Sequence, residues 1–252
     1  MMNTYLEAVI LAGGSGTRLR QVVPHLPKPM AEIAGRPFLE ILLSSLAKKK
    51  FSRVILSVGF MAEKIIEHFG HQFSGMSLTY AVEEKPLGTG GALRFALSQA
   101  TQDHVFIFNG DTYLDLEVEA VEAQWQQHCL PIIVGREIQD QDVSRYGRLL
   151  TDGKQVYGFA EKVTRSLLES LENADKSQMS LQELKVVNAG CYVLPKAVLD
   201  NYPPNIPFSL ETDYFSKIIG QMPFKLFISA GYFIDIGVPE EYLRAQRELI
   251  NR

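Results

Sequence analysis

Short apolar runs alternate along the chain with segments whose apolar positions recur every three or four residues. The run at residues 8–12 has no polar side chain and stops at a pair of glycines, which is typical of a strand buried on both faces of a parallel sheet. Residues 37–49 have apolar positions at helical spacing and end in lysines. The whole pattern predicts strands at residues 8–12, 53–58, 78–82 and 104–108, and helices at residues 37–49, 62–69, 214–220 and 239–250.

The order of these elements predicts an α/β fold. Alternating strands and helices favour a Rossmann-like three-layer α/β/α arrangement around a mixed, mostly parallel sheet. Residues 148–160 depart from this order, because a Thr-Asp-Gly-Lys turn divides them into two short strands and so predicts a hairpin. Residues 166–184 keep helical spacing but are polar, and we expect them to form a flap or a subunit contact.

Composition narrows the class of protein. The chain has 252 residues, of which 46% are apolar, enough for a sizeable core. A net charge of −4 without a long basic run argues against nucleic-acid binding. Two cysteines do not make a disulfide framework, and we expect Cys129 and Cys191 to be small core residues. Neither a signal segment nor a long apolar span is visible, which favours a cytoplasmic protein with no membrane partner.

The first apolar run leads into a glycine-rich turn that carries an arginine. Gly13, Gly14 and Gly16 lack β-carbons, so backbone N–H groups can approach an anion, and Arg18 adds a planar, permanently charged fork. The spacing lacks the Gly-Lys-Ser/Thr of a Walker A loop, and Leu19 stands where a dinucleotide fingerprint needs its third glycine. The turn therefore predicts another kind of phosphate-binding loop, and a plain tight turn is the alternative.

Lys28 stands between two prolines, which restrict its backbone and would hold the cation in place, whereas a solvated loop lysine is the alternative. Together, residues 11–19 and 27–30 resemble the paired signature of the sugar-1-phosphate nucleotidyltransferases. The resemblance implies the nucleotide-diphospho-sugar transferase fold, and phosphate and nucleotide contacts from both motifs. The residues so implied are Leu11, Ala12, Gly13, Gly14, Ser15, Gly16, Thr17, Arg18 and Lys28.

A second glycine-rich stretch, residues 83–93, resembles the base-recognition motif of the same family. Its glycines permit close approach to a flat base, and its carboxylates can accept hydrogen bonds from ring N–H and amino groups. Guanine presents two such donors side by side, so we expect GTP. The expected contacts are Glu83, Gly88 and Thr89; Glu84 is the other candidate carboxylate, and solvated side chains beside a turn are the alternative for both glutamates.

Two aspartates lie next to apolar runs that are far apart in the sequence. Asp111 follows the predicted strand at 104–108, and Asp235 precedes the predicted helix at 239–250. Such an aspartate is often only a turn residue, yet both stand where the family places its metal ligands. A magnesium ion on a triphosphate keeps several waters and needs only one or two carboxylates, so the resemblance implies that Asp111 and Asp235 bind Mg²⁺.

The resemblance places the sugar 1-phosphate against the second half of the chain. In the family a Tyr-Gly backbone, a Glu-Lys pair and an Asn-x-Gly segment surround the hexose. A carboxylate can hold two hydroxyls and an ammonium can meet the sugar phosphate, whereas an exposed ion pair is the alternative for the Glu-Lys pair. The matching residues are Gly110, Tyr146, Gly147, Glu161, Lys162, Asn188 and Gly190.

The resemblance spans residues 11–242. We expect residues 1–252 to form one catalytic domain, with a nucleotide-binding part to about residue 115, a sugar-binding part at about 130–235, and no C-terminal β-helix. That length is similar to the compact members of the family, which include heptose-1-phosphate guanylyltransferases. The resemblance leaves open whether the chain acts alone or as a homo-oligomer.

The expected reaction is attack of a sugar 1-phosphate oxygen on the α-phosphorus of GTP, which releases pyrophosphate and leaves a GDP-sugar. No nucleophilic side chain is needed, so the expected catalytic residues Arg18, Lys28, Asp111 and Asp235 position substrates and offset charge. D-glycero-α-D-manno-heptose 1-phosphate is the expected sugar. Mannose 1-phosphate with GTP, an amino-sugar 1-phosphate with UTP, and a non-catalytic nucleotide-sugar-binding regulatory subunit are the alternatives.

Overall fold

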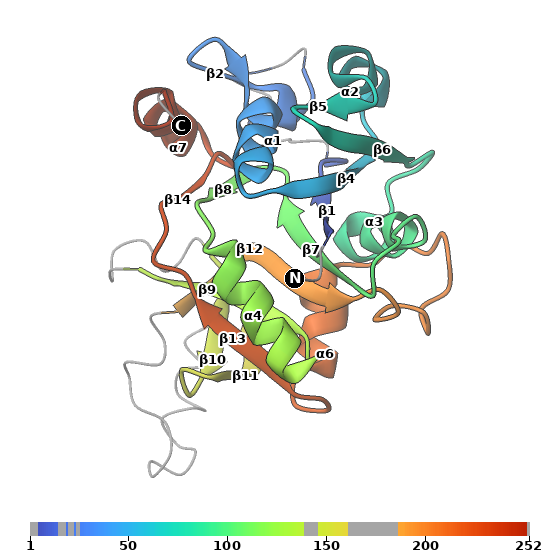
Figure 1. Cartoon of the computed structure of the whole chain (residues 1–252), viewed down its shortest axis with the longest axis vertical. Coiled ribbons are helices and arrows are strands. Elements are labelled where there is room, and N and C mark those ends of the chain that lie inside the picture. Colours follow the sequence, from blue (N-terminus) through green and yellow to red (C-terminus); the bar gives the residue numbers. More distant parts are fainter. Residues whose placement is uncertain are drawn as a thin grey trace.

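The structure is a computed structural model that describes residues 5–14, 19, 23, 26–138, 146–160 and 186–250. In these residues ten strands form one mixed sheet in the order β10-β11-β13-β9-β12-β7-β1-β4-β6-β5 (Figure 1). Its strands are β1 (Leu6–Leu11), β4 (Phe51–Val58), β5 (Gln72–Phe73), β6 (Met76–Val82), β7 (His104–Asn109), β9 (Ile132–Glu137), β10 (Arg148–Thr151), β11 (Gln155–Ala160), β12 (Val186–Pro195) and β13 (Phe224–Ile228). Two small sheets are added by β2 (Glu32–Ile33) with β3 (Arg36–Pro37), and by β8 (Thr112–Leu114) with β14 (Phe233–Asp235).

The sheet has two differently built halves. On one side β7, β1, β4 and β6 are parallel neighbours, and Val9 of β1 lies opposite both Ile55 and Ile107. On the other side β12 is antiparallel to β7 and to β9, and the predicted hairpin of β10 and β11 is present. Because β10 also pairs with β12, this half of the sheet curls back on itself.

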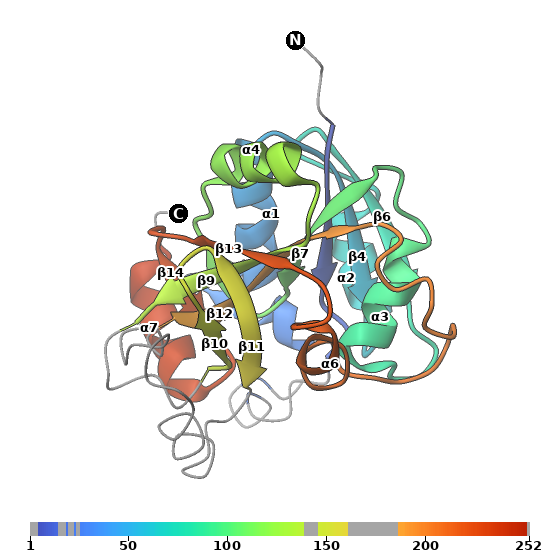
Figure 2. The same cartoon turned by 90° about the horizontal axis from the view of Figure 1, so that it is seen from below.

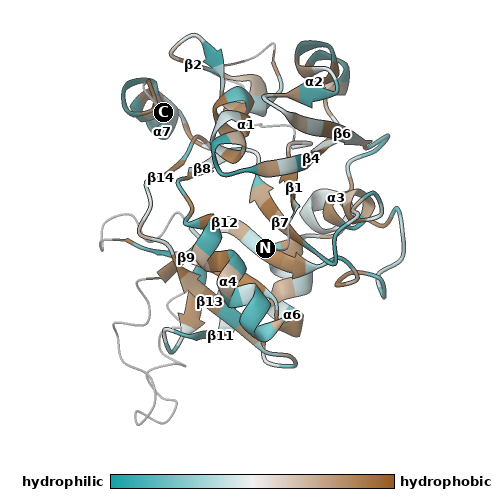
Figure 3. Cartoon of the chain, viewed as in Figure 1, coloured by the Kyte–Doolittle hydropathy of each residue, from teal (hydrophilic) through white to brown (hydrophobic). Residues whose placement is uncertain are grey.

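Helices cover both faces of the sheet, as the sequence predicts (Figure 2). Alternate residues of β1 point to opposite layers: Ala8 and Ile10 belong to the apolar cluster that includes α1, α2, α4 and α7, and Val9 to the cluster of α3 and η4. The helices are η1 (Lys28–Met30), α1 (Phe38–Lys48), α2 (Ala62–Phe69), α3 (Gly88–Leu97), α4 (Val118–His128), η4 (Leu210–Phe215), α6 (Ser216–Ile218) and α7 (Pro239–Glu248). The central strands are correspondingly hydrophobic, and α2 and α7 at the periphery carry hydrophilic turns (Figure 3).

Two sequence-based expectations are corrected. The helix predicted at 214–220 begins earlier, as the π-helical η4 followed by α6, and the Ser209 side chain caps it by accepting from the N–H of Thr212 at 3.1 Å. Cys191 is buried as predicted, but Cys129 is exposed, since it ends α4 in a left-handed conformation with φ 50°. The segment 166–184 lies outside the described residues. None of the helices described is both long and apolar enough to cross a membrane.

Candidate active site

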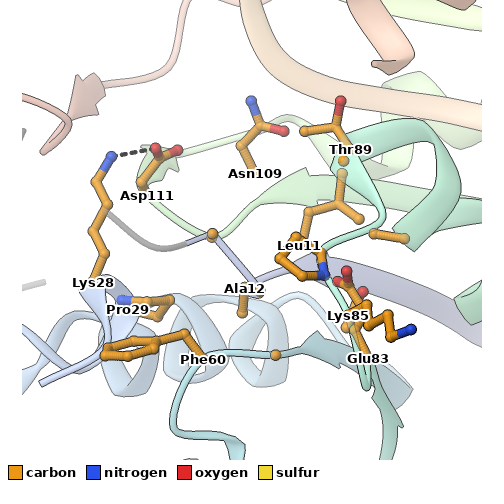
Figure 4. A pocket seen from close by; sticks show the side chains of 18 of the residues that line it. Leu11, Ala12, Lys28, Pro29, Phe60, Glu83, Lys85, Thr89, Asn109 and Asp111 are labelled. Carbon is orange, nitrogen blue, oxygen red and sulfur yellow. Dashed lines mark hydrogen bonds and ion pairs between the residues drawn. The ribbon is translucent and has the colours of Figure 1, made fainter. Parts of the chain in front are cut away.

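A cavity of about 550 Å³ lies at the carboxyl ends of β1, β4, β6 and β7 (Figure 4). Open α/β sheets bind their ligands at this edge, because the loops there diverge and leave a crevice. Nine of the predicted nucleotide-binding and catalytic residues line this cavity, together with Gly110, which was predicted to bind the sugar 1-phosphate. The nine are Leu11, Ala12, Gly13, Gly14, Lys28, Glu83, Gly88, Thr89 and Asp111.

Lys28 is held by its local backbone, as the two prolines predict. Pro27 is extended, with φ −64° and ψ 145°, and Pro29 is buried as the second residue of η1. The Lys28 side chain is only 11% exposed, and its ammonium donates a hydrogen bond to the carboxylate of Asp111 (Figure 4). This burial and pairing do not fit a solvated loop lysine.

The fold brings Asp235 to the same place across a separate strand pair. β14 is antiparallel to β8 and sets Asp235 opposite Thr112, and the N–H of Ile236 donates to the Asp111 carbonyl at 2.9 Å. A Cβ added to Gly237 would lie 2.8 Å from Asp235 Oδ1 and 3.2 Å from Lys28 Nζ. Both carboxylates therefore lie close to one ammonium group.

The chemistry of this pair fits a magnesium ion that arrives with a triphosphate. Within the described part of the chain no three His, Cys, Asp or Glu side chains form a metal-binding group. Mg²⁺ bound to a triphosphate needs only one or two protein carboxylates, and takes its other ligands from water and phosphate. The ammonium of Lys28 already lies against Asp111, so the position favours a positive charge.

Glu83 forms the wall at the β6 end of the cavity. Its Oε2 accepts a hydrogen bond from the Leu87 N–H at 2.8 Å. Burial raises the pKa of this carboxyl group, and the hydrogen bond from the Leu87 N–H offsets part of the rise. A Cβ on Gly13 would lie 2.6 Å from Glu83 Oε1, so glycine at that position makes room for the carboxylate. Glu84 also lines the cavity but is exposed.

The glycines of the second motif are enclosed by another part of the chain. Gly88 has φ +67°, and a Cβ on it would lie 2.5 Å from the Phe208 carbonyl oxygen. The N–H of Gly90 donates to that same carbonyl at 2.9 Å, and a Cβ on Gly91 would lie 2.7 Å from the carbonyl oxygen of Ile206. A neighbouring loop thus approaches these glycines closely, while Gly88 also lines the cavity, so its contact with a base stays a prediction.

Gly110 is required by the packing of two strand ends. Its N–H donates to the Leu11 carbonyl at 2.9 Å. A Cβ on Gly110 would lie 2.6 Å from that oxygen and 3.0 Å from the Cα of Ala12. The residue therefore joins the glycine-rich turn after β1 to the aspartate after β7.

Of the predicted sugar-binding residues that the structure describes, Gly110 lines the cavity, and the other four lie outside its lining: Tyr146, Gly147, Asn188 and Gly190. The Asn188 N–H donates to the Gly147 carbonyl at 2.7 Å. The Tyr146 ring packs with its centroid 5.4 Å from that of Phe233, in the strand that ends at Asp235. This contact joins the sugar-side residues to the metal-side strand.

Gly190, another predicted sugar-side residue, packs against a residue that lines the cavity. Its φ is +65°, and a Cβ there would lie 2.8 Å from Asn109 Nδ2. Asn109 itself lines the cavity. Six further predicted residues lie outside the described residues, so their roles stay predictions: Ser15, Gly16, Thr17, Arg18, Glu161 and Lys162.

The sequence analysis missed several lining residues. Ser57 lies near the end of β4, and Gly59 and Phe60 follow that strand at the same edge of the sheet. The rule that pointed to the other strand ends would have found them. Asn109 ends β7, directly before two predicted residues. The other missed lining residues are Pro29, Lys85, Pro86 and Ala92.

Comparison with known proteins identifies the family of the chain. A family model described as nucleotidyl transferase matches residues 7–252. Over 97% of its length the chain is 36% identical to the D-glycero-alpha-D-manno-heptose 1-phosphate guanylyltransferase of Aneurinibacillus thermoaerophilus, of which 98% is covered. Over 99% of its length it is 30% identical to the mannose-1-phosphate guanylyltransferase of Mycobacterium tuberculosis, of which 66% is covered. HddC from Yersinia pseudotuberculosis, in its crystal structure complexed with GMP-PN, matches with a TM-score of 0.79 and 33% identity, covering 97% of this chain and 99% of that one. The chain belongs to the nucleotidyl transferase family.

Proposed function

We propose that this nucleotidyltransferase transfers a guanylyl group from GTP to D-glycero-α-D-manno-heptose 1-phosphate with the help of Mg²⁺. The observation that carries the proposal is the convergence of Lys28, Asp111 and Asp235 at one side of a cavity whose other side is formed by Glu83. Two carboxylates beside a cation are suited to a metal–triphosphate, and a carboxylate at the far end is suited to a donor-rich base.

The chain's own residues would act by positioning and by offsetting charge. The sugar 1-phosphate oxygen forms a bond to the α-phosphorus while the bond to the β-phosphate oxygen breaks, and pyrophosphate takes the electron pair. Held by Asp111 and Asp235, Mg²⁺ would supply charge neutralisation between the two phosphates. Lys28 lies close enough to Asp111 to turn its ammonium towards a triphosphate oxygen. Arg18 and Lys162 remain the predicted partners of the triphosphate and the sugar phosphate.

Glu83 supports GTP as the nucleotide. Its Oε1 lies on the cavity side near Gly13, while Oε2 is occupied by Leu87. A carboxylate accepts hydrogen bonds and donates none, and guanine offers an N1–H and an amino group on one edge. Uracil and thymine offer a single N–H that lies between two carbonyl groups, and a carboxylate would repel those carbonyl oxygens.

The choice of sugar rests on the relatives. The relative at 36% identity is named for heptose 1-phosphate and is covered over 98% of its own length. The relative at 30% is named for mannose 1-phosphate and is covered over 66% of its length. Mannose 1-phosphate is therefore the second candidate. The non-catalytic alternative is disfavoured, because Lys28, Asp111 and Asp235 are all present and lie together.

Pyrophosphate release tests the proposal directly. GTP, CTP, UTP, dTTP and ATP would each be combined with heptose 1-phosphate, mannose 1-phosphate and N-acetylated hexosamine 1-phosphates in the presence of Mg²⁺. Release confined to GTP with heptose 1-phosphate is the expected result. Release with UTP would overturn the role of Glu83, release only with mannose 1-phosphate would replace the sugar, and no release with any pair would favour a nucleotide-sugar-binding protein.

A further inference from the structure

A loop at residues 202–209, between β12 and η4, packs against the start of α3. It runs beside that helix in both views of the fold (Figure 1 and Figure 2). The Phe208 N–H donates to the Leu87 carbonyl at 3.0 Å, and the Phe208 carbonyl accepts from the Gly90 N–H at 2.9 Å. Phe208 thus forms a backbone hydrogen bond on each side of two residues that line the cavity.

Leu87 connects this loop to the carboxylate that we expect to contact the base. Its side chain is buried, its carbonyl accepts from Phe208, and its N–H donates to Glu83 Oε2 at 2.8 Å. Gly88 has φ +67°, and a Cβ on it would lie 2.5 Å from the Phe208 carbonyl oxygen, so the backbone is closely packed directly after Leu87. A shift of Phe208 would therefore be passed to Leu87, and from Leu87 to the Glu83 carboxylate.

We propose that Phe208 is a positioning residue for base recognition: by holding Leu87, it fixes the direction in which the Glu83 carboxylate meets the edge of guanine. The proposal rests on the function proposed above, in which Glu83 accepts hydrogen bonds from the base. Phe208 itself lies outside the lining of the cavity, so it acts through Leu87 and not by touching the nucleotide.

The Phe208 ring anchors the loop on the helix. A Cβ on Gly90 would overlap Cδ2 and Cε2 of this ring and lie 2.9 Å from its Cζ, so the ring rests directly on the helix backbone at that glycine. The ring also stacks on that of Tyr202, with centroids 4.6 Å apart and planes at 23°. The side chains at residues 203–207 are exposed, so they add less to this packing than the half-buried Phe208.

The ratio of the dissociation constants for ITP and GTP, measured by calorimetry with Mg²⁺ present, reports the direction of the carboxylate. Hypoxanthine and guanine share N1–H and O6, and only guanine has the amino group that a carboxylate can bind beside N1–H. In the wild type we expect GTP to bind about 10- to 100-fold more tightly than ITP, as for one hydrogen bond to a charged group. Because both ligands are measured on the same protein, a smaller folded fraction does not change the ratio.

Phe208→Ala tests the proposal, because it removes the ring and keeps the backbone groups. Without the ring the loop is no longer held against Gly90, so Leu87 and the Glu83 carboxylate gain freedom to turn. We expect the ITP-to-GTP ratio to fall by about tenfold, since GTP loses a hydrogen bond that ITP never forms. Phe208→Leu keeps an apolar side chain at this place and should restore part of the ratio.

Gly90→Ala disturbs the same contact from the side of the helix. The three atoms nearest to its added Cβ all belong to the Phe208 ring, so we expect the variant to lose both stability and preference for GTP. In Phe208→Ala the ring is absent, and adding Gly90→Ala should then cause little further loss of either, because the two changes break one contact. If Phe208→Ala does not fold, the ratio in Gly90→Ala decides.

Phe95→Ala is the matched control. Phe95 is also a half-buried aromatic residue that packs on α3, but it lies near the other end of that helix and outside the lining of the cavity. Its loss should lower stability and keep the ratio. An unchanged ratio in both Phe208→Ala and Gly90→Ala, or an equal fall in Phe95→Ala, would overturn the proposal.

The wild type separates this proposal from the one on which it rests. Equal binding of GTP and ITP would overturn the base contact of Glu83 and, with it, the role of Phe208. A wild type that prefers GTP to ITP but releases no pyrophosphate with any sugar 1-phosphate would overturn the proposed function alone.

Discussion

The ammonium of Lys28 donates a hydrogen bond to the carboxylate of Asp111, although the two residues are 83 positions apart in the sequence. The first follows the glycine-rich turn, and the second follows the last parallel strand of the nucleotide half. Their contact shows that the two motifs meet at one point. It also means that, before any ligand binds, the Lys28 ammonium already balances the charge of the Asp111 carboxylate, which we expect to bind a metal.

Asp111→Asn should leave the fold intact and abolish metal-dependent turnover. The substitution keeps the size of the side chain but removes the charge that would hold Mg²⁺, so we expect kcat to fall by more than ~10²-fold. Pyrophosphate release and a thermal unfolding curve would measure the two effects. Asp115→Asn is a suitable control, because Asp115 pairs with Lys49 outside the cavity. Turnover at the wild-type level in Asp111→Asn would remove Asp111 from the metal site.

Lys28→Met should strengthen the binding of a divalent cation and at the same time lower turnover. Without the ammonium, Asp111 faces Asp235 unbalanced, so a divalent cation should bind the nucleotide-free protein more tightly while turnover falls. Titration with Mn²⁺ followed by electron paramagnetic resonance measures the affinity without any reaction. Lys49→Met, which removes the ammonium that pairs with Asp115, controls for loss of a lysine. Equal Mn²⁺ affinity in the wild type and Lys28→Met would show that Lys28 does not compete with the metal.

Glu122→Gln should lower the free energy of unfolding at neutral pH and leave it unchanged in acid. Burial alone would raise the pKa of Glu122, but hydrogen bonds from His104 and Gln126 outweigh burial and lower it. A carboxyl group with a lowered pKa in the folded state stabilises the protein above its unfolded pKa, and this stabilisation is lost as the pH falls through the folded pKa. Urea unfolding from pH 3 to 7 should show a difference of ~1 kcal/mol at pH 7 that vanishes in acid. The exposed Glu119→Gln should show none.

Much of the fold follows from local patterns. The helix at residues 62–69 has the predicted bounds, and the parallel strands match within two residues at each end, because apolar runs and helical spacing are properties of neighbouring residues. The position of the cavity was also predictable from local patterns, since the ends of the predicted strands carry residues that line it. Lys28 was predictable for a similar reason: prolines on both sides restrict the backbone whatever the tertiary structure.

Contacts between distant segments were not predictable in this way. The glycines of the second motif are packed by a loop that begins more than a hundred residues later, so their sequence could not show whether a base or the chain itself approaches them. The hydrogen bond between Thr89 and Glu211 was equally unpredictable, because the two residues are 122 positions apart. Cys129 was misplaced since composition does not reveal that α4 ends at that residue.

Gly110→Ala should destabilise the protein by strain between the strand ends. The added Cβ would lie 2.6 Å from the Leu11 carbonyl oxygen, and backbone cannot move aside as a side chain could. We expect a loss of ~1–3 kcal/mol in the free energy of unfolding, typical of overpacking. Gly14→Ala is the matched control, because no atom of the residues that the structure describes lies within 4 Å of its added Cβ. Equal stability of the two variants would mean that the turn after β1 can shift freely.

Glu83→Gln should weaken the preference for GTP without weakening the fold. Burial raises the pKa of the Glu83 carboxyl, so its charged form is costly in the folded protein, and a neutral glutamine that still accepts from Leu87 removes that cost. Guanine, however, would face an amide with one acceptor in place of a carboxylate with free lone pairs. We expect kcat/KM for GTP to fall by about 10- to 100-fold while stability holds or rises.

In the wild type, kcat/KM for GTP should decline as the pH falls through the raised pKa of Glu83, since protonation gives the base edge a donor in place of an acceptor. The decline should be absent from Glu83→Gln, which has no proton to gain. Glu84→Gln, at the exposed neighbour, should keep both the GTP preference and the pH profile of the wild type. A pH profile shared by all three proteins would place the base elsewhere, since the one group expected to titrate against guanine would then have no effect on its binding.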